Sequence, residues 1–434
     1  MAQAAPVLEP WELSTRGHYV KSMTRTHDNP QTAIKDIWAN GKDAGATELC
    51  VVGRMIGNIT TLITADNGPG PRDMNPNSPD YGNITHASFL GILDLGYTTA
   101  LHNHLAIGQF GSAASTAPLR LGKDVVIATR TPSFFYCALL SASLISEDPQ
   151  RRGMQVPYLV CEINSGQWHE NTDGSFAAFA AHTPFGDGSA DDCAKLLEVC
   201  EEFLPKPGGL LHVISSLSDT IEIGKERYDI IMPKLAHGFD TSLSRFLGYA
   251  FYKSSGDDDN MKITINGKAV SHLKETGKGP FRNSMLKLRK TEPYKARDDD
   301  SSDKLPIKAS IGFGFTTTEG AGTLASFDER PFGLCISFNG MMVQMFKLLP
   351  KQVSGFRSGA SAANKVGTYW HGLVVHVELE VEQGKKLEDY DLLINHRKDG
   401  FQENKAYNKL LSAVERQAKA YIDSKKETDA FLQP

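Results

Sequence analysis

The feature that most constrains the fold is a helix with a polar face that leads directly into two strands. Residues 30 to 45 have helical periodicity, and the segment AIKDIWANGKDAGAT places Asp36, Asn40 and Asp43 at spacings of four and three. Side chains at these spacings share one face of a helix. An amphipathic helix ordinarily buries apolar side chains on the face that packs against the rest of the protein. The first question that the sequence raises is therefore what these carboxylate and amide groups contact.

Two strands and a covering segment are expected next. The segment TELCVVGRMIGNITTLITADNG holds two apolar, β-branched runs, which predict paired strands that deliver Asp66 into a glycine-rich bend. Residues 71 to 107 begin with Pro, Asn, Gly and Ser and continue into ASFLGILDLGY, so they predict a long covering loop with a helix inside it. The segment IGQFGSAASTAPLRLGKDVVIATRT then predicts a glycine pair, a helix of small residues and a strand.

The remaining pattern predicts an α+β protein. Strands are expected at 134–141, 155–163 and 208–217 and within IKASIGFGFTT, FGLCISFNGMMVQMF and GLVVHVELEV, helices at 241–253 and 402–426, a hairpin turn at NGK and an exposed loop at 290–305. This order predicts an α/β sandwich with a mixed sheet, followed by a second α/β domain. Because 434 residues exceed what one core usually holds, we expect domains at 1–205 and 206–434.

Composition narrows the class of protein. The formal net charge of −5 makes no demand for a nucleic-acid partner, and the hydrophobic fraction of 40% is ordinary for a soluble globular chain. The six cysteines include no CxxC pair, which disfavours a structural zinc site and a disulfide framework. No basic segment leads into an apolar run at the N-terminus, and no run of about 18 apolar residues occurs, so neither export nor membrane insertion is expected. The cytosol and the nucleus remain.

Three short clusters carry chemistry, in the order helix, strand end and glycine loop. They are Asp36 with Asn40 and Asp43, the DNGPG of residues 66–70, and the GQFGSAAST of residues 108–116. A nucleotide site needs a ligand for a hard cation, an acceptor for the adenine amino group and backbone N–H groups near phosphate oxygens, and the clusters offer one of each. Taken singly none is specific, because DNG is more often a plain hairpin turn and GxxG is weaker still.

The ordered set resembles the GHKL (Bergerat-fold) ATPases, which include the gyrase B subunit, MutL and the large heat-shock chaperones, and it is most similar to the Microrchidia (MORC) ATPases. The family's first box has Glu, Asn four residues on and then Asp-Ala, which DIWANGKDAGAT matches with Asp36, Asn40 and Asp43. The DxGxG box matches Asp66, Gly68 and Gly70. The GxYGxG box and the MRIGKD strand entry match GQFGSAASTAPLRLGKD, and ERYDIIMP and INHRKDGFQENKAYNKL resemble the RYDI and NKQDF segments of the MORC transducer domain. The motifs span roughly residues 25 to 425.

This resemblance implies that the polar helix face looks into a pocket for ATP and Mg²⁺. Asn40 would hold Mg²⁺ beside the phosphates, Asp66 would accept from the adenine amino group, and Asp36 would be the general base that polarises the attacking water. Lys398 would reach the γ-phosphate from the second domain. The implied nucleotide-binding set is Asn40, Asp43, Asp66, Gly68, Gly70, Gly108, Gly111 and Ser112, with the two glycines at 108 and 111 in the phosphate-covering lid.

The chain departs from the family at three positions of these motifs. Asp36 replaces Glu and is one methylene shorter, and misplacing a catalytic group by about 1 Å can reduce a rate by on the order of 10²-fold. Ala113 replaces the third lid glycine, and Ser115 replaces a lysine that faces the phosphates. Because of these departures, we expect the chain to hydrolyse ATP slowly or not at all.

The resemblance also implies a biological role. Family members dimerise through their N-terminal domains when ATP is bound and act in chromatin compaction and gene silencing, so an ATP-dependent homodimer in the nucleus, with DNA or chromatin proteins as partners, is expected. The chain lacks a CW-type zinc finger and a long coiled coil. The alternative from another class is a pseudoenzyme scaffold that mediates protein interactions. A GHKL chaperone or mismatch-repair protein is a third interpretation, which LRLGKD and HRKDGF disfavour.

Three other segments favour ordinary interpretations. His102 and His104 suggest a metal site but have no third ligand nearby, so they are better explained as loop histidines. KSSGDDDNMK lacks the turn glycine and distal glutamate of a calcium loop and is better explained as a solvated acidic turn. The basic residues of 284–297 could contact nucleic-acid phosphates, although a solvated loop is the stronger interpretation.

Overall fold

The structure of the chain is a computed structural model with two units, Met1–Met232 with Asp259–Val270, and Pro233–Asp258 with Ser271–Pro434. It describes residues 12–13, 30–93, 113–147, 154–171, 174–186, 193–217, 222–223, 230–231, 243–251, 261–270, 289–290, 294–295, 308–315, 333–347, 349, 373–395 and 400–426. The limits of the units differ from the boundary expected at residue 205. Strand β9 (Gly208–Leu217) and the hairpin of β12 (Lys262–Ile265) and β13 (Lys268–Ala269) join the sheet of the first unit.

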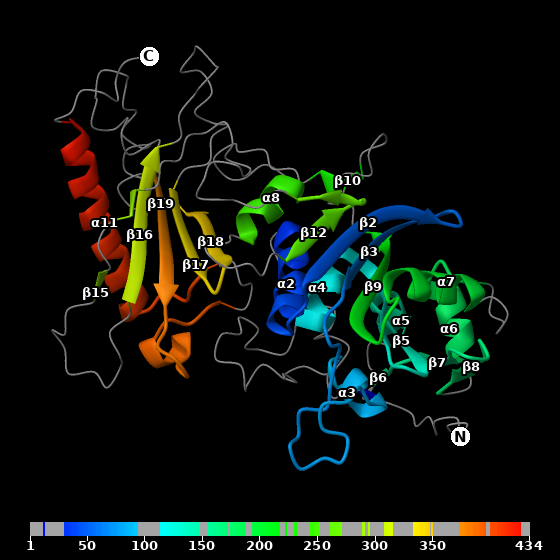
Figure 1. Ribbon diagram of the computed structural model, residues 1–434. Helices are drawn as coiled ribbons and strands as arrows, with labels where there is room; N and C mark the ends of the chain where they lie inside the picture. Colours follow the sequence, from blue (N-terminus) through cyan, green and yellow to red (C-terminus); the bar gives the residue numbers. More distant parts are fainter. Residues whose placement is uncertain are drawn as a thin grey trace. The chain divides into compact units, whose positions relative to one another are not determined.

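A mixed sheet of nine strands forms the frame of the first unit (Figure 1). Its order is β13-β12-β2-β3-β9-β4-β5-β7-β8, where β2 is Glu48–Ile56, β3 Ile59–Asp66, β4 Gly122–Arg130, β5 Phe134–Ser141, β7 Tyr158–Glu162 and β8 Trp168–Glu170. All neighbours are antiparallel except β12 and β2, which are parallel. The mixed α+β class expected from the sequence is therefore confirmed.

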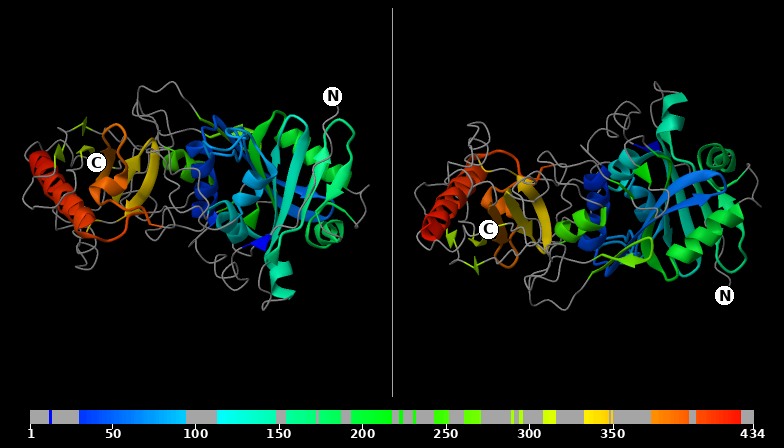
Figure 2. Two further views of the ribbon diagram at one scale, coloured as in Figure 1. Left: turned by 90° about the horizontal axis from the view of Figure 1, so that it is seen from below. Right: turned by 90° about the horizontal axis from the view of Figure 1, so that it is seen from above.

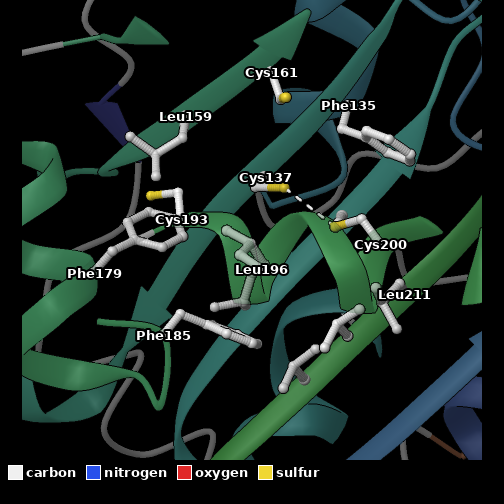
Figure 3. Packing of buried hydrophobic residues seen from close by; sticks show 14 of the residues in the cluster. Phe135, Cys137, Leu159, Cys161, Phe179, Phe185, Cys193, Leu196, Cys200 and Leu211 are labelled. Carbon is white, nitrogen blue, oxygen red and sulfur yellow. Dashed lines mark hydrogen bonds between the residues drawn. The ribbon is translucent and has the colours of Figure 1, made fainter. Parts of the chain in front are cut away.

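Helices cover both faces of this sheet. On one face, α2 (Pro30–Asp43) packs against α4 (Ala113–Leu121), which contacts β4, β5 and β9, and α3 (His86–Gly91) contacts β5. On the other face, α6 (Ser175–His182) and α7 (Ala194–Phe203) pack over alternate residues of the strands. Figure 3 shows this second layer, in which Leu196 and Cys200 of α7 lie over Cys137 of β5. The cysteines in this layer, Cys137, Cys161, Cys193 and Cys200, are buried free thiols.

Short elements complete the first unit. The α5 helix (Ala142–Glu147) follows β5, β1 (Glu12–Leu13) pairs with β6 (Met154–Gln155), and β10 (Glu222–Ile223) pairs with β11 (Ile230–Ile231). The expected hairpin turn at NGK is confirmed, because Asn266 and Gly267 have φ values of 48° and 74°, as a two-residue turn with both residues left-handed requires. The two helices α6 and α7 were not predicted from the sequence.

The second unit has its own sheet, of order β14-β16-β19-β17-β18 with β15 also paired to β16. The strands are β14 (Arg289–Lys290), β15 (Tyr294–Lys295), β16 (Lys308–Phe315), β17 (Gly333–Phe338), β18 (Met341–Lys347) and β19 (Leu373–Glu380). The long helix α11 (Lys405–Lys426) lies along this sheet in both views of Figure 2, where it is red, and Tyr421 stacks on Phe313. The α8 helix (Leu243–Ala250) contacts β18, and the 3₁₀ turn η4 (Leu387–Tyr390) follows β19.

One sequence prediction for this unit is wrong in part. Residues 290–305 are expected to form an exposed loop, but Lys290 belongs to β14 and Tyr294 and Lys295 form β15, and both strands pair with β16. Backbone hydrogen bonds to the free edge of β16 are sufficient to order these short strands without an apolar pattern, which is why the composition did not reveal them. The rest of that segment lies outside the described residues.

Candidate functional site

The end of β3 and the last turn of α2 meet at one point. Leu49 of β2 pairs with Asp66 of β3, and only residues 44–47 connect α2 to β2. A Cβ added to Gly41 would lie 3.3 Å from the Asp66 Cβ and 3.4 Å from its Cγ. The helix backbone at Gly41 therefore lies directly against the Asp66 side chain, and the first two clusters of the sequence are neighbours in space.

Sequence reasoning missed Gly41, although a signal was present. A glycine inside a helix is less favourable than alanine by about 1 kcal/mol, so it usually has a packing reason. Here the reason is the close approach of α2 to Asp66 and to the Leu49 Cδ2, which would lie 3.0 Å from the added Cβ.

Asp66 is half-buried as a residue, and its carboxyl group accepts hydrogen bonds from the backbone. Its Oδ1 accepts from the backbone N–H of Gly68 at 2.8 Å, and the backbone N–H of Leu210 also bonds to the carboxylate. Desolvation by the surrounding protein raises the pKa of Asp66 to about 6, and the two N–H groups lower it, with desolvation the larger effect. The carboxylate is therefore ionised at neutral pH and becomes protonated within a physiological range of acidity.

The DNGPG bend is fixed to the strands on either side of it. The Asn67 Oδ1 accepts from the backbone N–H groups of Thr47 and Glu48, at 2.9 and 2.8 Å, and so holds the connection between α2 and β2. The Gly68 carbonyl accepts from the Gly209 N–H at 2.6 Å. Gly70 has φ of 76°, and an added Cβ would lie 2.8 Å from the Ile84 Cδ1. Contacts within the protein thus account for the glycine at position 70, whether or not a ligand is present.

The other polar residues of the first cluster differ in exposure. Asp36 is 2% exposed, whereas Asn40 and Asp43, nearer the C-terminal end of α2, are half-buried. The half-buried polar residues of α2 are thus near the end of the helix that touches Asp66. Asn40 and Asp43 carry oxygen atoms of the kind that Mg²⁺ prefers, an ion that takes few ligands from a protein and keeps several waters.

The third cluster and Lys398 are described only at their borders. Gly108, Gly111, Ser112 and Lys398 lie outside the described residues, as do His102 and His104. Ala113 is the first residue of α4, so the glycine pair immediately precedes the N-terminus of a helix that packs on α2. Near Lys398, the Asn395 N–H donates to the Gly400 carbonyl at 3.0 Å.

Asp124, the last residue of the LGKD match, is a structural carboxylate. It is 3% exposed and accepts from the hydroxyl groups of Ser141 (2.5 Å), Ser216 (2.6 Å) and Ser143 (3.2 Å). These serines belong to β5, the end of β9 and α5. Asp124 therefore ties three elements together, at the end of the strands opposite the end where Asp66 lies.

A buried polar pair lies two residues from Asp66 on the same face of the sheet. The Thr64 hydroxyl and the His212 Nδ1 are 3.2 Å apart, and His212 is 2% exposed. Within the described part of the chain, the His212 Nε2 has no hydrogen-bond partner. Burial lowers the pKa of His212 to about 4, so the ring is neutral at pH 7. The only indication of this pair in the sequence is a single histidine inside the apolar run GGLLHVISSL.

Comparison with known proteins adds no family assignment. No protein-family model matches the sequence, and no curated protein matches it significantly. Among the described residues, no group of three or more His, Cys, Asp or Glu side chains is arranged to hold a metal ion, and no described helix is long and apolar enough to cross a membrane.

Proposed function

We propose that the first unit is a nucleotide-binding module of the GHKL class, with the Bergerat fold. The observation that supports this most is the contact of Gly41 with Asp66, which puts the last turn of α2 beside the carboxyl group at the end of β3. ATP with Mg²⁺ is the cofactor of this proposal. Asp66 accepts from the adenine amino group, Asn40 binds the ion, and the segment before α4 supplies backbone N–H groups to the phosphates.

Within that class, we propose that the chain is a MORC-like ATPase that hydrolyses ATP slowly. Asp36 acts as general base and Lys398 contacts the γ-phosphate, both by resemblance. Binding of ATP to the dimeric form alone would shift the monomer–dimer equilibrium towards the dimer. The cellular role of this proposal is chromatin compaction or gene silencing in the nucleus, with DNA or chromatin proteins as partners.

The acceptor role of Asp66 predicts how affinity depends on pH. Titration calorimetry with a non-hydrolysable ATP analogue and Mg²⁺ should give a constant affinity above about pH 7, because the carboxylate is ionised there. Below pH 6 the affinity should fall by up to about tenfold per pH unit, since the protonated carboxyl group no longer serves as the acceptor. Asp66→Asn should bind at least about tenfold more weakly at pH 7.5, because its amide N–H₂ group would face the adenine amino group.

The Asp66→Asn variant also serves as the control for pH. An asparagine at position 66 does not titrate, so the affinity of this variant for the nucleotide should stay constant between pH 7.5 and 5. If its affinity falls with pH as much as that of the wild type, a group other than Asp66 causes the pH dependence. Nucleotide binding that is indifferent to Asp66→Asn at pH 7.5 would remove Asp66 from the site.

The alternative is a scaffold that has lost catalysis. The specific observation in its favour is that Gly70 meets Ile84 and Gly209 meets Asp66, so packing alone accounts for both glycines. The replacements at Asp36, Ala113 and Ser115 are consistent with it. Under this alternative, calorimetry detects no nucleotide binding with or without Mg²⁺.

A further inference from the structure

A series of three hydrogen bonds connects β4 to the Asp66 carboxylate. The Thr129 hydroxyl donates to the Gly209 carbonyl at 2.7 Å, and the Gly209 N–H donates to the Gly68 carbonyl at 2.6 Å. The Gly68 N–H in turn donates to the Asp66 Oδ1 at 2.8 Å. Because β9 lies between β3 and β4 in the sheet, the series runs across three neighbouring strands and ends on the carboxylate.

The series passes through a β-bulge in β9. The register of β4 against β9 shifts between Ala128 and Arg130, so that Thr129 lies opposite two residues, Gly209 and Leu210. Gly209 has φ of 75°, the left-handed conformation that a glycine adopts in one common type of bulge. A bulge bends its strand and takes one residue out of the regular ladder. Gly209 therefore bonds to the bend after β3 through its N–H and to the Thr129 side chain through its carbonyl.

A hydroxyl group at position 129 has a cost that its hydrogen bond offsets. Thr129 is fully buried in a central strand, where valine would fill the same volume without a polar group to desolvate. The Thr129 side chain lies on the same face of the sheet as that of Asp66. Ala128 and Ala65, the residues before them, belong to the core under α7, and successive side chains of a strand alternate between the faces.

We infer that Thr129 is a positioning residue for the Asp66 carboxylate. Its hydroxyl holds Gly209, Gly209 holds Gly68, and the Gly68 N–H fixes the orientation of the carboxylate. An acceptor that is oriented before its ligand arrives loses less conformational freedom on binding. The inference rests on the proposed function, in which Asp66 accepts from the adenine amino group.

The structural part of the inference is tested without nucleotide. Hydrogen exchange of the full chain, followed by mass spectrometry, reports the amides of Gly68 and Gly209 in peptides covering residues 66–70 and 207–211. Thr129→Val should speed exchange in both peptides by about tenfold, as expected for the loss of one buried hydrogen bond. Thr129→Ser, which keeps the hydroxyl group, should restore the wild-type rate.

The matched control is Thr61→Val. Thr61 is equally buried, and its hydroxyl donates to the Arg54 carbonyl at 2.8 Å near the opposite end of β3. The control removes an equivalent bond, so exchange that follows from a general loss of stability should be the same in both valine variants. Thr129→Val should therefore exceed Thr61→Val at 66–70 and 207–211. Equal exchange in the two variants would overturn the positioning role.

The second measurement links Thr129 to the proposed ligand. Desolvation raises the pKa of Asp66 to about 6, and the Gly68 N–H opposes this effect. Calorimetry with the ATP analogue and Mg²⁺ should show that Thr129→Val binds about tenfold more weakly at pH 7.5. Its affinity should begin to fall at a higher pH than that of the wild type, because a weakened Gly68 bond lets the pKa of Asp66 rise further.

The pH profile separates positioning from a general effect on the fold. Thr61→Val should keep the wild-type profile, and a wild-type profile in Thr129→Val would overturn the action of Thr129 on Asp66. If the wild-type chain binds no nucleotide, the proposed function fails, and the exchange measurement alone decides whether Thr129 holds the bend.

Discussion

Replacing Gly209 with alanine should lower the free energy of unfolding by about 3 kcal/mol, the sum of a left-handed backbone penalty and a steric clash. Gly209 has φ of 75°, and its added Cβ would lie 2.6 Å from the Asp66 carbonyl oxygen and 2.7 Å from the Leu204 Cδ2. The first of these atoms belongs to the backbone, so it cannot move aside without shifting the end of β3. Urea denaturation of wild type and variant measures the change.

Gly384→Ala is the matched control for this variant. Gly384 has φ of 79°, but an added Cβ would meet nothing within 4 Å. Its loss of stability should therefore be confined to the backbone penalty, about 1 kcal/mol. Equal losses in the two variants would contradict the close packing of Gly209 against Asp66.

If the packing is as described, Gly209→Ala should also weaken nucleotide binding, because it displaces the Asp66 segment.

Two groups that the fold desolvates, His212 and Asp66, should make opposite contributions to the dependence of stability on pH. His212 has its pKa lowered from 6.5 to about 4, so stability due to His212 is lost as pH falls through this interval. Asp66 has its pKa raised from 3.8 to about 6, so the native state binds the proton first, and stability due to Asp66 is gained as pH falls from 6 towards 4. Each contribution is about 3 kcal/mol in full, and the two nearly cancel.

Removing either group should expose the contribution of the other. Between pH 6.5 and 4.5, Asp66→Asn should lose about 2 kcal/mol more stability than wild type, because only the His212 effect remains. His212→Gln, which retains an acceptor for Thr64, should lose about 2 kcal/mol less than wild type over the same interval. The midpoints of urea denaturation of the three proteins at the two pH values measure these differences. All other ionisable groups are the same in the three proteins, so their contributions cancel in the comparison. Parallel pH curves for the three proteins would show that neither group is buried as described.

Local pattern was sufficient to predict much of the secondary structure. The strands expected at 134–141 and 208–217 have these bounds in β5 and β9, and the helix expected at 30–45 ends two residues earlier in α2. Each has a clear hydrophobic period. The β12–β13 hairpin shows where local pattern fails, since its turn is evident in the sequence but its parallel pairing with β2, some 200 residues away, is not.

The sequence predicted those residues of the candidate site that carry functional groups in a recognisable motif. It did not predict the residues whose role is to pack against other parts of the fold. Asp66 was expected at a strand end beside the polar helix, and it lies there against Gly41. The hydrogen bonds from the Thr47 and Glu48 N–H groups to Asn67 could not be predicted. The sequence Asp-Asn-Gly also occurs in ordinary turns, where the asparagine makes no such contacts. The hydrogen bond of Thr129 could not be predicted either, because its partner Gly209 lies 80 residues further along the chain.

The measurement that tests the central claim most directly is the solution mass of the purified chain by light scattering, with and without Mg²⁺ and a non-hydrolysable ATP analogue. We predict a shift from monomer to dimer on adding the nucleotide, and no shift in Asn40→Ala, which removes the proposed ligand of the ion. A mass that stays monomeric with saturating nucleotide, or a dimer that forms equally well in Asn40→Ala, would contradict an ATP-gated dimer.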